Sequence, residues 1–440
     1  MTRTEFTGWG RTAATFAKVA QPVSADEVAA LIRGAAGPVI ARGFGRSYGD
    51  CAQTAGGIVV DATGIGGISG WERGDGVVTC GAGVSLRELV NEAVPRGWFV
   101  PVSPGTSMVT VAGAIAADVH GKNHHRAGSF GAHVLSIDIV DGTGHRRRLL
   151  PGTEPFRATV GGMGLTGIIV SAELALLPIR GAQMRVATRR TVDFDATIAA
   201  LADADRATYS VAWLDCVASG AEFGRGVVSS GEHAAGSVRG KVLAPERVSA
   251  PSWVPPRLLN RRTIAVFNSA WHRRAPKSRD DELQSIREFF YPLDAVANWN
   301  RAYGRRGFVQ YQFVVPESSL STLRTILETF ARTGVASFLT VLKRFGASND
   351  AYMSFPMPGW TLALDIPADT EGLAALLRWA DEQVASAGGR VYLAKDSRIA
   401  PDVLAVMYPN LQQFRQACSH LDPRGVFASD QSRRLRLLRD

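Results

Sequence analysis

The chain has 440 residues, of which 46% are hydrophobic and 20% are charged; these proportions exclude a disordered protein. This length is too great for one ordinary core, so we expect two domains or one domain with a large insert. The net charge of +9 suits a ligand that carries phosphate, an anionic lipid surface or nucleic acid.

Neither a metal scaffold nor a membrane span is indicated. The four cysteines are far apart and form no CxxC pair, which argues against a structural zinc site and against a disulfide framework. The first twenty residues lack a continuous apolar region, and no stretch of 18 apolar residues occurs, so we expect no signal peptide and no transmembrane helix. We therefore expect a protein made in the cytoplasm, with attachment to a membrane surface left open.

Short strands, short helices and glycine loops alternate through the first 180 residues. Residues 23–36 predict a helix capped by Ser24 and Glu27, and a second helix follows Ser85. Strands are predicted at 38–42, 57–63 and 76–84, and a hairpin over 134–150 turns at 141–144. A long strand is expected after the glycine turn at 159–167.

The pattern of predicted strands, helices and loops changes near Arg180. Residues 184–194 predict a strand and 195–205 a helix, whereas 221–280, rich in glycine, proline and arginine, are interpreted as partly mobile surface loops. Strands at 308–316 and 360–367 alternate with amphipathic helices at 320–334 and 373–389. This alternation predicts an antiparallel sheet with helices on one face.

Three glycine-rich stretches carry the chemical signal. "IARGFGRSYGD" (40–50) ends a strand in a turn whose successive N–H groups can form an anion-binding nest, to which Arg42 and Arg46 add charge. It is neither a phosphate loop of the Walker type nor a Rossmann fingerprint, and an ordinary glycine turn is the alternative. The second stretch, residues 101–125, contains a run of small side chains that leaves room for a flat ligand against the backbone. The third stretch is the glycine-rich loop at 159–169.

Four of the eight histidines lie between His120 and His133, in and after "DVHGKNHHRAGSFG". A metal site is one interpretation, but the adjacent His124 and His125 cannot both face one ion from a strand, and no acidic third ligand follows at helical spacing.

A nucleic-acid-binding protein would explain the net positive charge, yet no nucleic-acid-binding module is recognisable in the sequence. A loop pressed against a cofactor is the third interpretation.

These stretches resemble the FAD-binding half of the vanillyl-alcohol-oxidase-type flavoproteins. A closer resemblance, to the decaprenylphosphoryl-β-D-ribose 2-oxidase family, rests on "WGRTA", "GRSYGD", "HGKNHHRAGSFG", "NRAYG", "QYQFVVP", "FPMPGW", "AKDSR" and "DPRGVFASDQSRRL". It implies an α+β, two-domain fold of the PCMH type. An FAD-binding domain would comprise 1–185 and 390–440, and a substrate domain with an antiparallel sheet would comprise 186–389.

The resemblance also implies the FAD contacts. They would come from Arg42, Gly43, Phe44, Gly45, Arg46, Ser47, Tyr48 and Gly49 in the first loop, from Gly105, Thr110, Val111, Ala112, Gly113, Ala117, Asp118, Val119 and His120 in the second stretch, and from Ile169 and Tyr392. Many relatives bind FAD covalently through a histidine in the first loop. "RSYGDC" contains none, so non-covalent FAD is expected.

The implied reaction oxidises the 2-hydroxyl of decaprenylphosphoryl-β-D-ribose to a ketone, the first half of an epimerisation that makes the arabinose donor for cell-wall arabinan. Lys395 is the leading catalytic residue, and His120 and Lys122 would complete the polar shell at the flavin. The predicted substrate contacts are Tyr48, Gln310, Gln312, Lys343, Thr361, Ala363 and Lys395, with Trp213, Phe345 and Trp360 as apolar walls. His124 and His125 are expected to serve hydrogen bonds within their own loop.

The implied partners are a polyprenyl-phosphate sugar, an NAD-dependent reductase of the keto sugar, and quinone or oxygen as electron acceptor. Association with the membrane, on its periplasmic face, follows from the lipid substrate. An oxidase of aldonolactones or alditols within the same superfamily is the alternative. One departure is local: inhibitor-sensitive members carry a cysteine where this chain has Ala363, and Thr361 replaces an asparagine.

Overall fold

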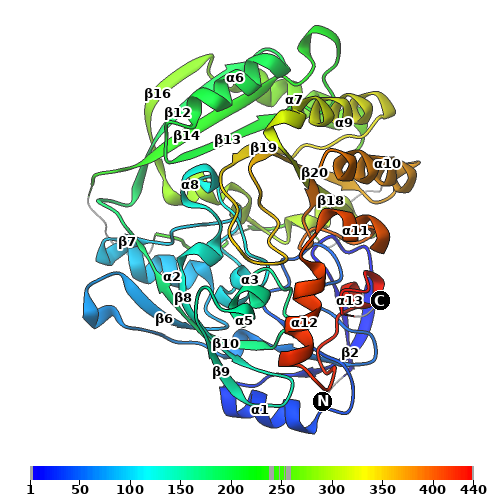
Figure 1. Ribbon diagram of the computed structural model, residues 1–440. Coiled ribbons are helices and arrows are strands. Elements are labelled where there is room, and N and C mark those ends of the chain that lie inside the picture. Colours follow the sequence, from blue (N-terminus) through cyan, green and yellow to red (C-terminus); the bar gives the residue numbers. More distant parts are fainter. Residues whose placement is uncertain (1–2, 237–241, 247, 252, 254–258, 439–440) are drawn as a thin grey trace.

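The computed structural model describes residues 3–236, 242–246, 248–251, 253 and 259–438. Figure 1 shows two halves, with both chain ends in the lower one and the middle of the chain in the upper one. The lower half contains two sheets. In one, β1 (Arg3–Thr7), β2 (Ala14–Ala20), β4 (Ile58–Asp61) and β3 (Val39–Arg42) are neighbours in that order.

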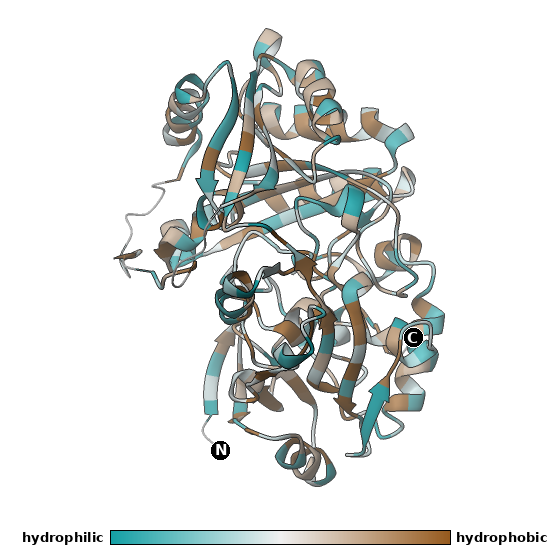
Figure 2. Ribbon diagram, turned by 90° about the vertical axis from the view of Figure 1, so that its left-hand side faces the viewer, coloured by the Kyte–Doolittle hydropathy of each residue, from teal (hydrophilic) through white to brown (hydrophobic). Residues whose placement is uncertain are grey.

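The second sheet of the lower half follows the order β5 (Ile68–Ser69), β6 (Val77–Gly81), β10 (Ile168–Ala175), β8 (Val134–Val140) and β9 (Arg146–Leu149). Hydrophobic residues occupy much of the central strands of this half (Figure 2). The hairpin predicted over 134–150 is confirmed, because β8 and β9 pair antiparallel. A small pair of strands joins β7 (Trp98–Phe99) to β11 (Leu177–Pro178).

The helices of this half begin where their capping residues predict. Ser24 accepts a hydrogen bond from Glu27 N at the start of α1 (Ala25–Gly34), and Ser85 and Glu88 form a full capping box on α2 (Leu86–Ala93). The shorter helices are α3 (Val111–Ala116), α4 (His124–Ala127) and α5 (Glu154–Thr159).

The upper half is built on one antiparallel sheet of eight strands. Their order is β16 (Ser278–Ser285), β12 (Gln183–Thr191), β14 (Gly226–Ala234), β13 (Tyr209–Leu214), β19 (Thr340–Phe345), β20 (Gly359–Pro367), β18 (Phe308–Val315) and β21 (Arg390–Val391). The helices α6 (Phe194–Ala204), α7 (Arg261–Arg274), α9 (Leu320–Thr333) and α10 (Leu373–Ser386) lie at the top of the molecule (Figure 1). The opposite face of the sheet is therefore left for the lower half.

The prediction of loops over 221–280 is wrong for much of that segment. It supplies β14 near the centre of the large sheet, the edge strand β16 and the fourteen-residue helix α7. The sequence pattern does not reveal them, because β14 contains several glycine and serine residues, and the inner face of α7 contains the polar Asn268 and His272 beside a single apolar residue, Ile264. The rest of the upper half consists of β15 (Val248–Ser249), α8 (Ile286–Phe290) and β17 (Val296–Ala297), and part of the predicted segment lies outside the described residues.

The chain returns to the lower half at its end, through α11 (Pro401–Met407), α12 (Leu411–Leu421) and α13 (Asp430–Arg434). Val39 of β3 exchanges backbone hydrogen bonds with Val426 and Ala428, and Arg434 forms ion pairs of 2.8 Å with Asp50 and with Asp396. We propose domain boundaries at 1–185, 186–389 and 390–440. Sheet membership supports this division, although β12 of the large sheet already begins at Gln183 and β21 still pairs with β18.

Candidate active site

The three glycine-rich stretches meet around α3. A Cβ atom added to Gly43 would lie 2.5 Å from Thr110 Oγ1, the atom that caps α3. On the other side, Gly161 N–H donates to Ile115 O (3.0 Å) and Met163 N–H to Ala116 O (2.9 Å). Segments separated by more than 100 residues therefore enclose one small-residue surface, as a flat ligand requires.

The first loop presents a row of hydrogen-bond donors. Within the described chain, the backbone N–H groups of residues 44 to 47 donate to no other residue, and the buried Nε of Arg46 also has no partner. The far end of the loop is held in place, because Tyr48 N–H donates to Ala394 O (2.9 Å). A Cβ atom on Gly49 would lie 1.7 Å from Asp396 O, so only glycine fits there.

These features fit the pyrophosphate of FAD. Successive free N–H groups and an arginine whose Nε has no hydrogen-bond partner are the donors that a phosphate anion recruits. Gly105 and Gly113 are exposed, and nothing lies within 4 Å of a Cβ atom added to Gly105, so the second stretch leaves room beside the first loop. The Thr110 hydroxyl itself is used by Gly113 N–H at 3.0 Å.

Several predicted FAD contacts also have structural tasks. The Arg42 guanidinium donates to Thr7 O (2.8 Å) and Ala52 O (3.1 Å), and the contribution of its charge to anion binding stays a prediction. The Asp118 carboxylate accepts from four groups: Ser129 Oγ, Gly131 N, Asn349 Nδ2 and Ser354 Oγ. The backbone N–H of Asp118 donates to Ile115 O (3.0 Å), so only its backbone carbonyl remains for a cofactor.

The other predicted FAD residues differ in exposure. Ala112 is partly exposed and Phe44 is exposed, whereas a further group is packed in the hydrophobic core: Val111, Ala117, Val119, Ile169 and Tyr392. The Tyr392 hydroxyl donates to Ala117 O at 2.7 Å, and this bond joins the C-terminal part of the chain to the second glycine-rich stretch.

The large sheet turns one polar row toward this surface. Opposite residues of antiparallel strands share a face, and Gln312 pairs with Ala363, Gln310 with Asp365, and Lys343 with Thr361. The predicted substrate residues on β18, β19 and β20 therefore lie together on the face that looks away from α9 and α10. The register of the sheet brings together residues that are up to 55 positions apart.

His120 joins the two halves at this row. Its Nδ1 lies 3.2 Å from Lys343 Nζ and its Nε2 lies 2.9 Å from Gln312 Nε2. Burial and the neighbouring Lys343 hold the pKa of His120 well below its usual value, so the ring is neutral. A charged Lys343 can only donate, so Nδ1 accepts and Nε2 carries the proton. The Gln312 carboxamide then meets it with its oxygen, after an amide flip.

Lys395 and Tyr48 form the second part of the site. The ammonium group of Lys395 lies 3.8 Å from the centre of the Tyr48 ring, which is fully buried. Asp365 is the nearby carboxyl, and its Oδ1 accepts from Gln310 Nε2 at 2.5 Å. Burial lowers the pKa of Lys395 and raises that of Asp365, and each charge partly offsets the effect of burial on the other. The pair can therefore exchange a proton with a bound substrate.

Three lysines share this buried region. Burial lowers the pKa of Lys343 to about 8, and burial together with Lys343 lowers that of Lys122 to about 7. Lys343 also lowers the pKa of Lys395. A buried cluster of cations with one carboxyl is unfavourable by itself and is relieved by a bound anion.

The histidine loop behaves differently from the prediction. His124 Nδ1 accepts from Gly346 N–H (3.2 Å), and His125 Nε2 lies 3.0 Å from Ala207 O, so both reach the upper half rather than their own loop. Only His133 bonds within the loop, to Ala127 O. Lys122 donates to Phe289 O and lies over the Phe289 ring, away from His120. Its catalytic role stays a prediction.

Two of the three predicted apolar walls face the site. The Phe345 ring packs against His120 at 4.8 Å, and Trp213 shares the face of its register partner Val341. Trp360 lies on the opposite face, beside Arg344, so its assignment to the wall is wrong.

Sequence reasoning missed Asp365. The signal was available in the alternation of β20, because Thr361, Ala363 and Asp365 occupy every second position. Asp365 follows Ala363 by two positions and Thr361 by four, so its side chain lies on the same face of the sheet as these two predicted substrate contacts.

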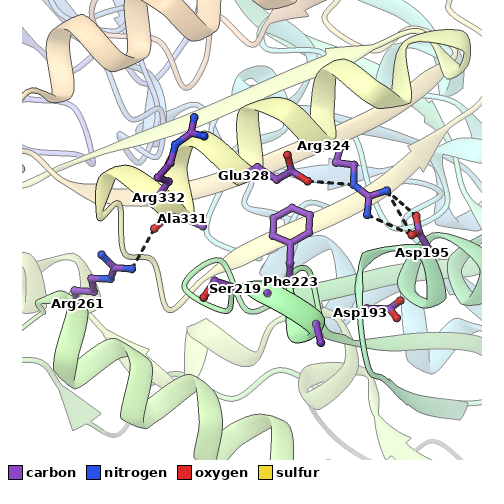
Figure 3. Close-up of a pocket in the computed structure, with 11 residues that line it drawn as sticks. Asp193, Asp195, Ser219, Phe223, Arg261, Arg324, Glu328, Ala331 and Arg332 are labelled. Carbon is purple, nitrogen blue, oxygen red and sulfur yellow. Dashed lines mark hydrogen bonds and ion pairs between the residues drawn. The ribbon is translucent and has the colours of Figure 1, made fainter.

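A cavity of about 710 Å³ lies elsewhere, between α9, the start of α6 and the loop at 219–223 (Figure 3). Arg324 dominates it, paired with Asp195 at 3.0 Å and Glu328 at 3.2 Å and stacked over Phe223. None of the predicted site residues lines this cavity.

Comparisons with known proteins agree with this geometry. A family model described as an FAD binding domain matches residues 16–150. The decaprenylphosphoryl-beta-D-ribose oxidase of Mycolicibacterium smegmatis is 41% identical over 98% of this chain and 97% of its own length. An uncharacterized Streptomyces coelicolor protein is 40% identical over 80% of this chain and all of its own length.

A more distant relative is the alditol oxidase of a Streptomyces species, which is 22% identical over 97% of both chains. The similarity to the first relative extends over both halves of this chain. The chain therefore belongs to the decaprenylphosphoryl-β-D-ribose oxidase family and is an FAD-dependent oxidoreductase.

Proposed function

We propose that this protein oxidises the 2-hydroxyl of decaprenylphosphoryl-β-D-ribose to the 2-keto sugar, the first half of the epimerisation that supplies arabinose for cell-wall arabinan. The observation that carries this proposal is the group formed by the partly buried Lys343 and Lys395 and the buried His120 beside one buried carboxyl, Asp365. Cations suit the phosphate of the substrate, and a lysine with a lowered pKa suits removal of a hydroxyl proton.

The reaction removes a hydride from C2 and a proton from its hydroxyl. Bound FAD supplies the hydride acceptor. Lys395 in its neutral form takes the proton, and Asp365 stabilises the ammonium that results. His120 and Gln312 hold the sugar hydroxyls, and Lys343 meets the phosphate. The aromatic rings of Tyr48 and Phe345 exclude water from the reacting carbon.

Anaerobic mixing of the purified protein with candidate substrates tests this function. Polyprenylphosphoryl-β-D-ribose should abolish the visible flavin absorption, whereas alditols and aldonolactones should leave it unchanged. The reverse result would establish the alternative, an oxidase of soluble polyols. The 22% identity to an alditol oxidase gives that alternative only distant support.

FAD is proposed to be non-covalent. The first loop has no histidine, and burial raises the pKa of the Cys51 thiol to about 11, which keeps it unreactive. Acid precipitation should release the yellow colour into the supernatant. Colour that stays with the precipitate would overturn this part of the proposal.

Two partners complete the proposed role. The keto sugar passes to an NAD-dependent reductase, and quinone or oxygen reoxidises the flavin. None of the helices in the described parts of the chain has the length and apolar character needed to cross a bilayer. The proposed substrate is nevertheless a membrane lipid, so we propose peripheral association, on the periplasmic face.

A further inference from the structure

Helix α7 (Arg261–Arg274) shows its apolar residues to the outside. Its inner face contains one apolar residue, Ile264, and two polar residues: Asn268, which donates to Asp215 Oδ1 at 2.9 Å, and His272, whose Nε2 lies 2.9 Å from Thr191 O. Val266, Phe267 and Trp271 are 72%, 48% and 51% exposed. More large apolar side chains of this helix therefore face outward than inward, and such an exposed apolar stripe indicates a binding surface.

Positive charge surrounds the stripe. Residues 260–279 contain six basic residues and no acidic one. Within the described residues, Arg262, Arg273 and Arg274 form no salt bridge, and all three are exposed. Aromatic side chains beside unpaired arginines match the boundary between the headgroups and the acyl chains of an anionic bilayer.

A row of aromatic rings runs from this stripe to the active site. Successive ring centres are separated by 6.2 Å (Phe267 to Phe338), 5.9 Å (Phe338 to Tyr303), 4.1 Å (Tyr303 to Phe308) and 5.4 Å (Phe308 to Tyr48). Tyr48 is the ring against which Lys395 lies. Tyr48, Tyr303 and Phe308 form a hydrophobic cluster separate from the main core, so a continuous row of packed rings connects the exposed stripe with the ring beside Lys395.

We propose that α7 docks this protein on an anionic phospholipid bilayer, with Val266, Phe267 and Trp271 entering the interface. The aromatic row then guides the polyprenyl chain of the substrate from the bilayer toward Lys395. This inference rests on the proposed function, because a lipid substrate gives the path its use. Charge complementarity favours an anionic bilayer over a protein partner.

The test uses the FAD-loaded full chain and vesicles of phosphatidylcholine with or without phosphatidylglycerol. Wild type should sediment with the anionic vesicles and much less with neutral ones. Phe267→Ser/Trp271→Ser should lower the partition coefficient at least about tenfold, since two aromatic side chains lose their apolar contact. Arg273→Gln/Arg274→Gln should weaken binding to anionic vesicles only.

Controls are Val192→Ser/Val406→Ser, which removes two apolar side chains elsewhere that are 66% and 68% exposed, and Arg180→Gln/Arg378→Gln for charge. Both should bind like wild type. Equal binding by Phe267→Ser/Trp271→Ser and wild type would overturn the proposal. Light scattering that shows a dimer for wild type and a monomer for Phe267→Ser/Trp271→Ser would also overturn the proposal, because the stripe would then be a protein interface.

Turnover of a water-soluble, short-chain prenylphosphoryl-ribose, without vesicles, separates the two proposals. Arg273→Gln/Arg274→Gln, which changes no ring of the aromatic row, should oxidise it like wild type. If wild type fails to oxidise it but binds vesicles through α7, the proposed function fails and the docking surface stands. If turnover is normal and vesicle binding does not depend on α7, the docking surface alone is wrong.

Discussion

At the scale of single residues, Lys395 is the most consequential position. Lys395→Met removes the proposed proton acceptor, so turnover should fall by about a hundredfold or more, while FAD stays bound. Anaerobic flavin reduction and the visible spectrum measure the two effects. Lys277→Met, on an exposed lysine, is the control. Normal flavin reduction in Lys395→Met would remove Lys395 from the mechanism.

The charge of Asp365 should set the pH dependence. Neutral Lys395 is the proposed base, and its pKa is lowered by burial, so kcat/KM should rise with pH over a range below the ordinary lysine value of about 10.4. The Asp365 carboxylate raises the pKa of Lys395. Asp365→Asn should therefore move the rising limb to lower pH, whereas an unchanged limb would show that the pair does not titrate together.

Substitutions of His120 and His125 should have different effects, because the two side chains have different partners. His120→Ala removes the contact between Lys343 and Gln312 and should reduce turnover by about tenfold or more. His125→Ala removes a bond to Ala207 O between the two halves and should lower thermal stability with little change in kcat. Equal losses of turnover in both variants would contradict this division.

At the scale of elements, strand β20 determines sensitivity to inhibitors that capture a cysteine. Ala363 lies opposite Gln312 and has no thiol, so intact mass should not change when the protein is incubated with such a compound. Ala363→Cys should acquire a mass shift of one adduct. A shift in wild type would show that one of the four buried cysteines reacts instead.

The elements also show where sequence reasoning succeeds. Capping boxes and period-two strands are local patterns, and α1, α2, β18 and β20 therefore begin and end close to their predicted bounds. The segment 221–280 fails this reasoning, since α7 turns polar residues inward. The sequence of α7 has helical periodicity. Its aromatic residues, from which a buried face would be predicted, lie on the exposed face of the helix.

At the scale of the whole molecule, Arg434 ties the chain end to the site. It pairs with Asp50 beside the first loop and with Asp396 beside Lys395, and both carboxylates are buried. Arg434→Gln leaves them without a charged partner and should cost about 2 kcal/mol of unfolding free energy. Arg433→Gln, on the neighbouring and more exposed pair with Asp430, should cost less than about 0.5 kcal/mol. Thermal unfolding compares the two, and equal losses would contradict the tie.

The sequence by itself determined the three glycine loops, the strands β12, β18 and β20 of the upper half and the residue types of the site, because turns, alternation and a family resemblance are properties of short segments. Only the tertiary structure decided which side chains meet. His120 lies between Lys343 and Gln312, and Asp365 lies near Lys395, because strand register and the return of the chain end bring distant residues to one face. The task of Arg42 and the outward face of α7 depend on such contacts too, and no local pattern contains them.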